Sequence, residues 1–244
     1  MEVMLPQARH SCYRLTMSAA LAIDMADAEP IVHKVTRVLR QAIVTMRIKP
    51  GEMVSEQEIA TKLGVSRQPV REAFIRLGEA GLLRVLPQRG TLVVKISRAA
   101  VEDARFIREA VECAVAREAA RKTGPRARTV LQDNLFRQKR AAREKDPEAF
   151  FTLDEEFHRL LAEIAGRPSA WRVIEDVKPQ MDRVRYLDMT DAMPMRALID
   201  QHGAITSAVL SGDALAAEGA MRHHLTEILR SLPRVAEQHA DLFE

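Results

Sequence analysis

The sequence predicts a mainly α-helical protein of two parts, an N-terminal winged helix-turn-helix and a C-terminal antiparallel bundle made only of helices. Residues 55–90 read as two short helices around a glycine turn, followed by two apolar runs that flank a basic turn. From Ser97 onward no segment alternates apolar and polar residues as a half-buried strand does. The length of 244 residues also exceeds what one domain usually contains.

The helix-turn-helix is the most specific local pattern. Helix is expected over about residues 30–48, ahead of the motif. Ser55 and Glu58 form a capping-box pair, which predicts that the first helix of the motif begins there. Gly64 ends that helix, because glycine adopts left-handed backbone angles at little cost, and Ser66 is placed to cap the next helix. The buried stripe of this second helix has helical spacing and consists of Val70, Phe74 and Leu77.

Three polar residues lie on the first turns of the second helix and away from its stripe: Arg67, Gln68 and Arg71. The N-terminal residues of a recognition helix reach base edges in the major groove, where Arg pairs with guanine and Gln with adenine. A small helical domain with a glycine turn is the alternative. Residues 31–96 carry twelve Lys or Arg against five Asp or Glu, which favours contact with phosphate.

The wing is predicted from two apolar runs, residues 82–86 and 91–95, which read as a β-hairpin. Its turn brings a basic side chain, Arg89, beside Gly90, which suits a close approach to DNA. The run VSRQPVREAFIRLGEAGLL followed by PQRG resembles the DNA-binding domain of the GntR family of bacterial regulators. That resemblance implies operator contacts from the recognition helix and the wing by Ser66, Arg67, Gln68, Pro69, Arg71, Arg89 and Gly90.

The chain is expected to divide into a loose arm over residues 1–28, a DNA-binding domain over residues 29–96 and a helical domain over residues 97–244. Met17 and Met25 are alternative translation starts. Cys12 and Cys113 lie in different contexts and are read as reduced thiols. No apolar run approaches the length of a membrane span and no secretory signal is visible, so a cytoplasmic protein is expected.

Six helices are expected in the second domain, because Gly and Pro residues interrupt it at regular intervals. Asp146 and Asp213 are placed as N-terminal caps, and Pro179 predicts a kink. The expected helices cover about residues 98–122, 126–145, 147–165, 169–189, 194–212 and 213–238.

Four polar residues lie on the apolar faces of three of these helices. Asp154 and His158 are four residues apart and share the stripe that contains Phe157. His202 and His224 are each flanked by apolar residues at helical spacing, whereas His223 points outward. A single inward histidine is most often a satisfied core residue, but a buried lone carboxylate is costly unless it is paired or bound to a metal. Together the four favour a divalent metal site for Zn, Ni, Mn or Fe.

A second resemblance supports that interpretation. The segments DEEFH from Asp154, HGAI from His202 and AMRHHL from Ala220 are similar to the FCD effector domain of the FadR subfamily, and the six-helix pattern is similar to its VanR-type branch. The resemblance implies that Asp154, His158, His202 and His224 bind the metal. It also implies that Arg108 meets the carboxylate of an effector, although an ion pair with Glu112 explains Arg108 equally well.

The sequence therefore predicts a ligand-responsive transcription regulator, and the resemblance to the family implies a repressor. It would bind a two-fold symmetric double-stranded DNA operator as a homodimer and respond to a small organic acid held at the metal. Two alternatives remain: an enzyme that uses the metal to activate water, and an architectural DNA-binding dimer without an effector. We expect no enzyme, because no further carboxylate or histidine is found as a general base on the inward faces.

Overall fold

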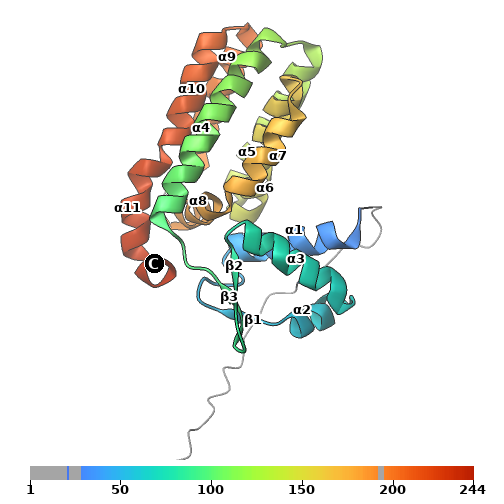
Figure 1. The fold of residues 1–244 in the computed structure, drawn as a ribbon. Coiled ribbons are helices and arrows are strands. Elements are labelled where there is room, and N and C mark those ends of the chain that lie inside the picture. The colour runs from blue at the N-terminus through green and yellow to red at the C-terminus, as the bar shows by residue number, and fades with distance from the viewer. Residues whose placement is uncertain (1–20, 22–28, 192–194) are drawn as a thin grey trace, which may run out of the picture.

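The fold is described by a computed structural model that covers residue 21, residues 29–191 and residues 195–244. The small N-terminal domain that is predicted to bind DNA, called the reader below, lies against one end of an elongated helical bundle (Figure 1). The predicted arm over residues 1–28, with its alternative starts and Cys12, falls almost entirely outside these residues. Within them, no helix is both long and apolar enough to span a bilayer.

The reader contains three helices and a three-stranded antiparallel sheet of order β1-β3-β2. Its elements are α1 Ile31–Val44, β1 Met53–Val54, α2 Glu56–Leu63, α3 Arg67–Glu79, β2 Leu83–Leu86 and β3 Gly90–Val93. The predicted hairpin of β2 and β3 is present, slightly shorter than expected. The strand β1 was not predicted, because two residues are too few to show an alternating pattern.

The predicted N-cap residues stand at the starts of their helices, but only some of them make a capping hydrogen bond. Ser55 and Ser66 occupy the N-cap positions of α2 and α3, and Gly64 ends α2 in a left-handed conformation with φ 66°. Neither serine side chain makes a capping hydrogen bond, so that part of the prediction is wrong. Asp146 and Asp213 do cap their helices, each accepting a backbone N–H three residues ahead at 2.9 Å.

The bundle consists of eight described α-helices and a short 3-10 helix. They are α4 Arg98–Arg121, α5 Pro125–Glu144, α6 Pro147–Ile164, α7 Pro168–Val177, α8 Pro179–Asp191, α9 Met195–Ser211, α10 Ala214–Thr226, α11 Ile228–Gln238 and η1 Ala240–Leu242.

Two of the six predicted helices are each divided into two, which corrects the predicted count. The expected kink at Pro179 is a complete break between α7 and α8, because proline has no N–H to continue the ladder. The last helix breaks at Glu227, between α10 and α11, and Pro233 lies inside α11. No residue pattern before Glu227 indicated that break.

Helix α8 lies across the end of the bundle that faces the reader (Figure 1). It packs against α1 of the reader and against α4, α6, α7 and α11 of the bundle. Every side chain from Lys178 to Met189 except Tyr186 is buried. A helix covered on all sides shows no apolar stripe, so its many charged residues must find partners inside the protein.

Replacing Phe150 with alanine should destabilise the bundle strongly. Phe150 is fully buried in a cluster with Phe151, Met189 and Leu198. Loss of a buried aromatic ring leaves a cavity and removes apolar contacts, with an expected loss of about 3–5 kcal/mol in the free energy of unfolding. Urea unfolding followed by circular dichroism measures it. Phe136→Ala is the matched control, because Phe136 is 60% exposed and its loss should change stability by at most about 0.5 kcal/mol.

Candidate metal centre and DNA-reading surface

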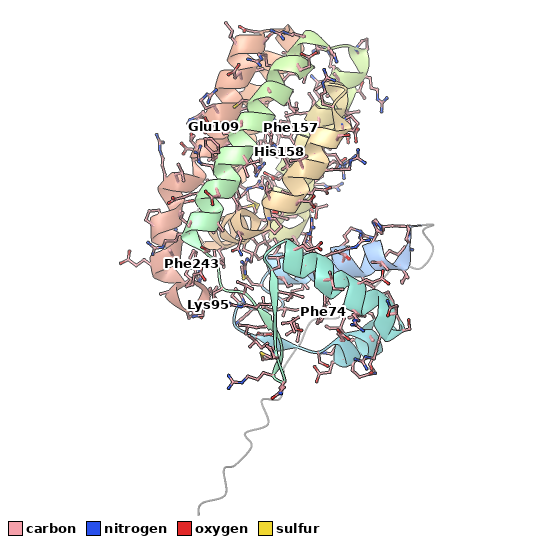
Figure 2. The ribbon with its side chains drawn as sticks, viewed as in Figure 1. Phe74, Lys95, Glu109, Phe157, His158 and Phe243 are labelled. Atoms are coloured by element: carbon pink, nitrogen blue, oxygen red, sulfur yellow. The ribbon has the colours of Figure 1, made fainter. Side chains whose placement is uncertain are left out.

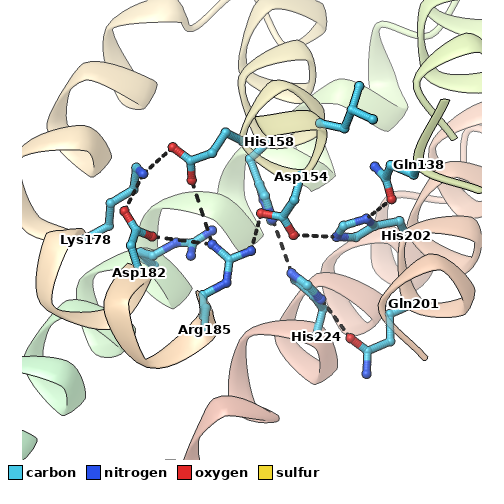
Figure 3. Close-up of polar contacts among 12 residues, drawn as sticks. Gln138, Asp154, His158, Lys178, Asp182, Arg185, Gln201, His202 and His224 are labelled. Carbon is cyan, nitrogen blue, oxygen red and sulfur yellow. Dashed lines mark hydrogen bonds and ion pairs between the residues drawn. The ribbon is translucent and has the colours of Figure 1, made fainter. Parts of the chain in front are cut away.

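Three helices bring the four predicted ligands together inside the bundle (Figure 3). Asp154 and His158 come from α6, His202 from α9 and His224 from α10. All four are buried, and one potential ligand atom from each lies within 4.8 Å of the others. The neighbouring His223 is largely exposed and points away, toward Glu227. The predicted cluster is therefore present in the fold, and the predicted outward direction of His223 is correct.

Each imidazole in the cluster has its outer nitrogen against a side-chain oxygen. The Nδ1 distances are 2.5 Å from His158 to Glu112 Oε2, 2.8 Å from His202 to Gln138 Oε1 and 2.8 Å from His224 to Gln201 Oε1. Amide oxygens only accept hydrogen bonds, so Nδ1 carries the proton in His202 and in His224, whereas Nδ1 of His158 meets the Glu112 carboxylate as an ion-pair contact. Nε2 of His202 and of His224 is then left with a lone pair directed at the cluster.

The orientation of the Gln138 amide is set by a short chain of hydrogen bonds. Its Nε2 donates to Asn134 Oδ1 at 2.7 Å, and Asn134 donates in turn to the backbone oxygen of Leu153 at 3.0 Å. Gln138 and Asn134 are both buried. Because this chain occupies the donor end of Gln138, its oxygen faces His202.

The inner atoms of the cluster face one another. The Nε2 atoms of His158 and His224 lie 3.2 Å apart, and His202 Nε2 lies 3.5 Å from Asp154 Oδ1. Asp154 Oδ1 and His202 Nε2 are buried without a hydrogen bond. Burial lowers the pKa of His202 to about 3 and that of His224 well below its ordinary value, so both stay neutral. Converging lone pairs and a carboxylate oxygen fit one divalent cation.

A buried arginine that the sequence analysis missed neutralises Asp154. The Arg185 guanidinium on α8 bonds Asp154 Oδ2, so this buried carboxylate is already paired with a cation. Burial would raise the pKa of Asp154, but Arg185 and the nearby histidines hold it well below its usual range. Arg185 had no visible signal, because α8 carries no apolar stripe against which an inward position could be recognised.

Glu112 corrects a second prediction, that no further carboxylate lies on the inward faces, because it is buried beside the cluster. Burial would raise its pKa, but Arg108 and His158 hold it well below its ordinary value. Arg108 donates its Nε to Glu112, so the ion pair that the four-residue spacing suggested is present. Arg108 is fully buried, yet among the described residues its Nη1 and Nη2 have no hydrogen-bond partner. The ion pair through Nε therefore leaves two donor nitrogens of Arg108 available.

A small cavity of about 30 Å³ lies beside the cluster, between α8, α9 and the break that separates α10 from α11. It is lined by Arg185, Asp188 and Glu227, by His224, and by apolar side chains of Met181, Met189, Leu198, Leu225 and Ile228. A space of this size holds about one water molecule.

The predicted DNA contacts lie on one helix and one wing. Ser66, Arg67, Gln68 and Arg71 are exposed at the start of α3, and the wing residues Arg89 and Gly90 are exposed at the turn between β2 and β3. Pro69, the third residue of α3, is buried and packs inward, so it cannot face an operator as its neighbours can. Two acids hold the reading side chains: Glu56 is 3.1 Å from Arg67, and Glu72 accepts from Gln68 at 2.9 Å.

Comparison with known proteins agrees with both halves of the molecule. Residues 31–93 match the model of the bacterial regulatory proteins of the gntR family, and residues 103–227 match the FCD domain. The HTH-type transcriptional repressor RspR of Escherichia coli K12 is 44% identical over 215 residues, which cover 88% of this chain and 94% of RspR.

Solved structures show the same fold. E. coli McbR/YncC aligns with a TM-score of 0.75 at 20% identity, covering 86% of this chain and 99% of that one. A GntR regulator from Rhodococcus sp. RHA1 aligns with a TM-score of 0.66 at 25% identity, covering 83% and 97%. From the winged helix-turn-helix, the helical bundle and these matches, the chain is a member of the GntR family of bacterial transcription regulators that carries an FCD domain.

Proposed function

We propose that this GntR regulator is a repressor whose operator binding is modulated by a small carboxylic acid held at a divalent metal in the bundle. The observation that carries the proposal is the convergence of three imidazole Nε2 atoms and one carboxylate oxygen, with His202 and His224 hydrogen-bonded to amide oxygens on their far sides and His158 against the Glu112 carboxylate. Such support orients histidine ligands for a metal. Zn, Ni and Mn all suit this set of nitrogen and oxygen donors.

The charge balance around the cluster favours an anionic effector. Beside the cluster, buried Arg108 faces Glu112 and buried Arg185 faces Asp154, so these four charges balance one another. A divalent cation would add two positive charges in a buried region, where an uncompensated charge is costly. A bound metal supplies a Lewis acid for a carboxylate oxygen, and the free Nη1 and Nη2 of Arg108 offer donors to the same acid.

On the DNA side, α3 would enter the major groove and the wing would contact the backbone nearby. Two copies of the reader would be needed for a two-fold symmetric operator, which supports a homodimer. A metal-dependent enzyme is the weaker alternative, because Glu112, the carboxylate nearest the cluster, is held charged by Arg108 and His158 and is a poor base. A purely architectural role would leave the histidine cluster without a purpose.

His224→Ala should remove the metal and the acid response while the reader still binds its operator. Elemental analysis of purified wild-type protein should find about one metal per chain. Addition of acetate should raise the melting temperature only of the metal-loaded form, as expected for a ligand of the native state. His223→Ala is the matched control, since His223 adjoins His224 but is exposed. Absence of stoichiometric metal from the wild type, or equal loss in the His223 variant, would rule out the site.

Arg67→Ala and Arg71→Ala should each weaken specific operator binding by about 1–3 kcal/mol, the range for a lost bidentate base contact. Fluorescence anisotropy at a fixed salt concentration, with specific and scrambled duplexes, measures this. Arg128→Ala provides the control, because Arg128 is an exposed arginine on α5 of the bundle. Unchanged specific affinity in both reader variants would contradict the assignment of α3 as the recognition helix.

Arg108→Lys should keep the metal but weaken acid binding by about tenfold or more. Lysine retains the charge opposite Glu112 but lacks the planar pair of donors that matches a carboxylate. Isothermal titration of metal-loaded protein with small monocarboxylates gives the affinity. If the variant binds the acids as tightly as wild type, then Arg108 serves only its ion pair.

A further inference from the structure

The linker between the reader and the bundle, residues 94–97, is held from one side by α8. Arg183 is fully buried and donates to the backbone oxygen of Val94 at 2.5 Å. Gln180 donates to the backbone oxygen of Gly81 at 2.8 Å, and its own oxygen lies 3.3 Å from the backbone nitrogen of Ser97. These bonds tie the end of α3, the end of β3 and the start of α4 to one helix.

The other side of the linker is held by residues 242–244, which we call the strap. Phe243 pairs with Ile96 as a short parallel bridge. The Ile96 N–H donates to the oxygen of Leu242 at 2.9 Å, and the Glu244 N–H donates to the oxygen of Ile96 at 3.1 Å. Ile96 is fully buried and Phe243 is 6% exposed, both in one apolar cluster. Figure 2 shows Phe243 close to Lys95 at the junction of the two domains.

The strap is the end of a helical arm that starts at the metal centre. His224 lies in the last turn of α10. The helix is interrupted at Glu227, and α11 then leads through η1 to the strap (Figure 1). The cavity of about 30 Å³ beside His224 is lined by Leu225, Glu227 and Ile228, on both sides of this break. The arm therefore joins this small cavity to the reader's linker along a path of the chain that does not include α8.

A molecule larger than water can enter the cavity only if part of its lining moves. Of the lining helices, α8 is covered on all sides. Helix α11, in contrast, has a solvent-facing side that includes Leu229, Arg230 and Pro233. Its first turn, which contributes Ile228 to the cavity, is therefore less enclosed than α8.

We propose that the strap couples the cavity beside His224 to the DNA reader: an occupant of the cavity moves α11, and α11 acts on the linker through the pairing of Phe243 with Ile96. The identity of the occupant as a metal-bound acid rests on the proposed function. The coupling between cavity and linker does not rest on the proposed function, since any group that fills the cavity should have the same effect.

A substitution can therefore replace the acid in the test. Leu198→Phe enlarges a side chain that lines the cavity and should change the operator Kd of the Zn²⁺-loaded full-length protein at least fivefold. Leu198→Met, of nearly the same volume, should leave the operator Kd within twofold of wild type. The two variants share the position and differ in how much of the cavity they fill.

The strap is then locked by a disulfide between Ile96→Cys and Phe243→Cys in a Cys12→Ser background. Directly paired residues of adjacent strands are close enough for such a bond, which mass spectrometry would verify. Cys113 should not interfere, because it is buried and its pKa is raised to about 11 by that burial. With the lock oxidised, Leu198→Phe should change the operator Kd less than twofold, and reduction should restore the full effect.

A second variant lacks Phe243 and Glu244, and Leu198→Phe should have no further effect on its operator Kd. Thermal unfolding confirms that each variant is folded before DNA binding is compared. The proposal is wrong if Leu198→Phe alters the operator Kd equally with the strap locked or absent, or if it has no effect with the strap free. If the wild-type protein binds no metal, the proposed function is wrong. The effect of the strap on the operator Kd of Leu198→Phe can then still be measured with the metal-free protein.

Discussion

Most of the other buried polar interactions depend on one constraint. A carboxylate and three imidazoles lie in the middle of an apolar bundle. Each buried group needs a partner, because an unpaired charge or donor in the interior costs several kcal/mol. The partners come from every side of the cluster: Asn134 and Gln138 on α5, Gln201 on α9, Arg108 and Glu112 on α4, and Arg185 on α8. Much of the polar content of the core is thus explained by one site.

That site also explains why a strongly charged helix can be buried. Arg185 on α8 faces Asp154, while Arg183, two residues earlier, faces the linker at Val94. Lys178, which directly precedes α8, pairs with Asp182 of α8 and with Glu155 of α6. Helix α8 therefore supports the cluster with one set of side chains and the reader with another. A rigid element between two sites is suited to hold them in register.

The parts of the fold that were predictable are those whose signals are local. Gly64 at the turn, the stripe of Val70 and Phe74, and the caps at Asp146 and Asp213 each depend on neighbouring residues, and each predicted its element. The four ligands were visible for the same reason, because a polar residue on an apolar stripe stands out at helical spacing.

What escaped prediction depends on contacts between distant segments. Arg185 could not be recognised, because its helix is buried on every side and has no polar face for comparison. Pro69 was assigned to the DNA surface by likeness to a motif, although its place in the helix turns it inward. The pairing of Ile96 with Phe243 joins the segment that precedes the bundle in the sequence to the segment that ends it, and no spacing along the chain indicates this pairing.

That pairing has a consequence for the order in which the protein forms during synthesis. The reader can fold as soon as its own residues have left the ribosome, because its core is complete without the bundle. Its orientation cannot be fixed at that point, since Ile96 must wait for residues 242–244 to be made. Closing so long a loop is among the later events of folding. A nascent chain would thus carry a finished DNA-binding module well before that module is held in its final position.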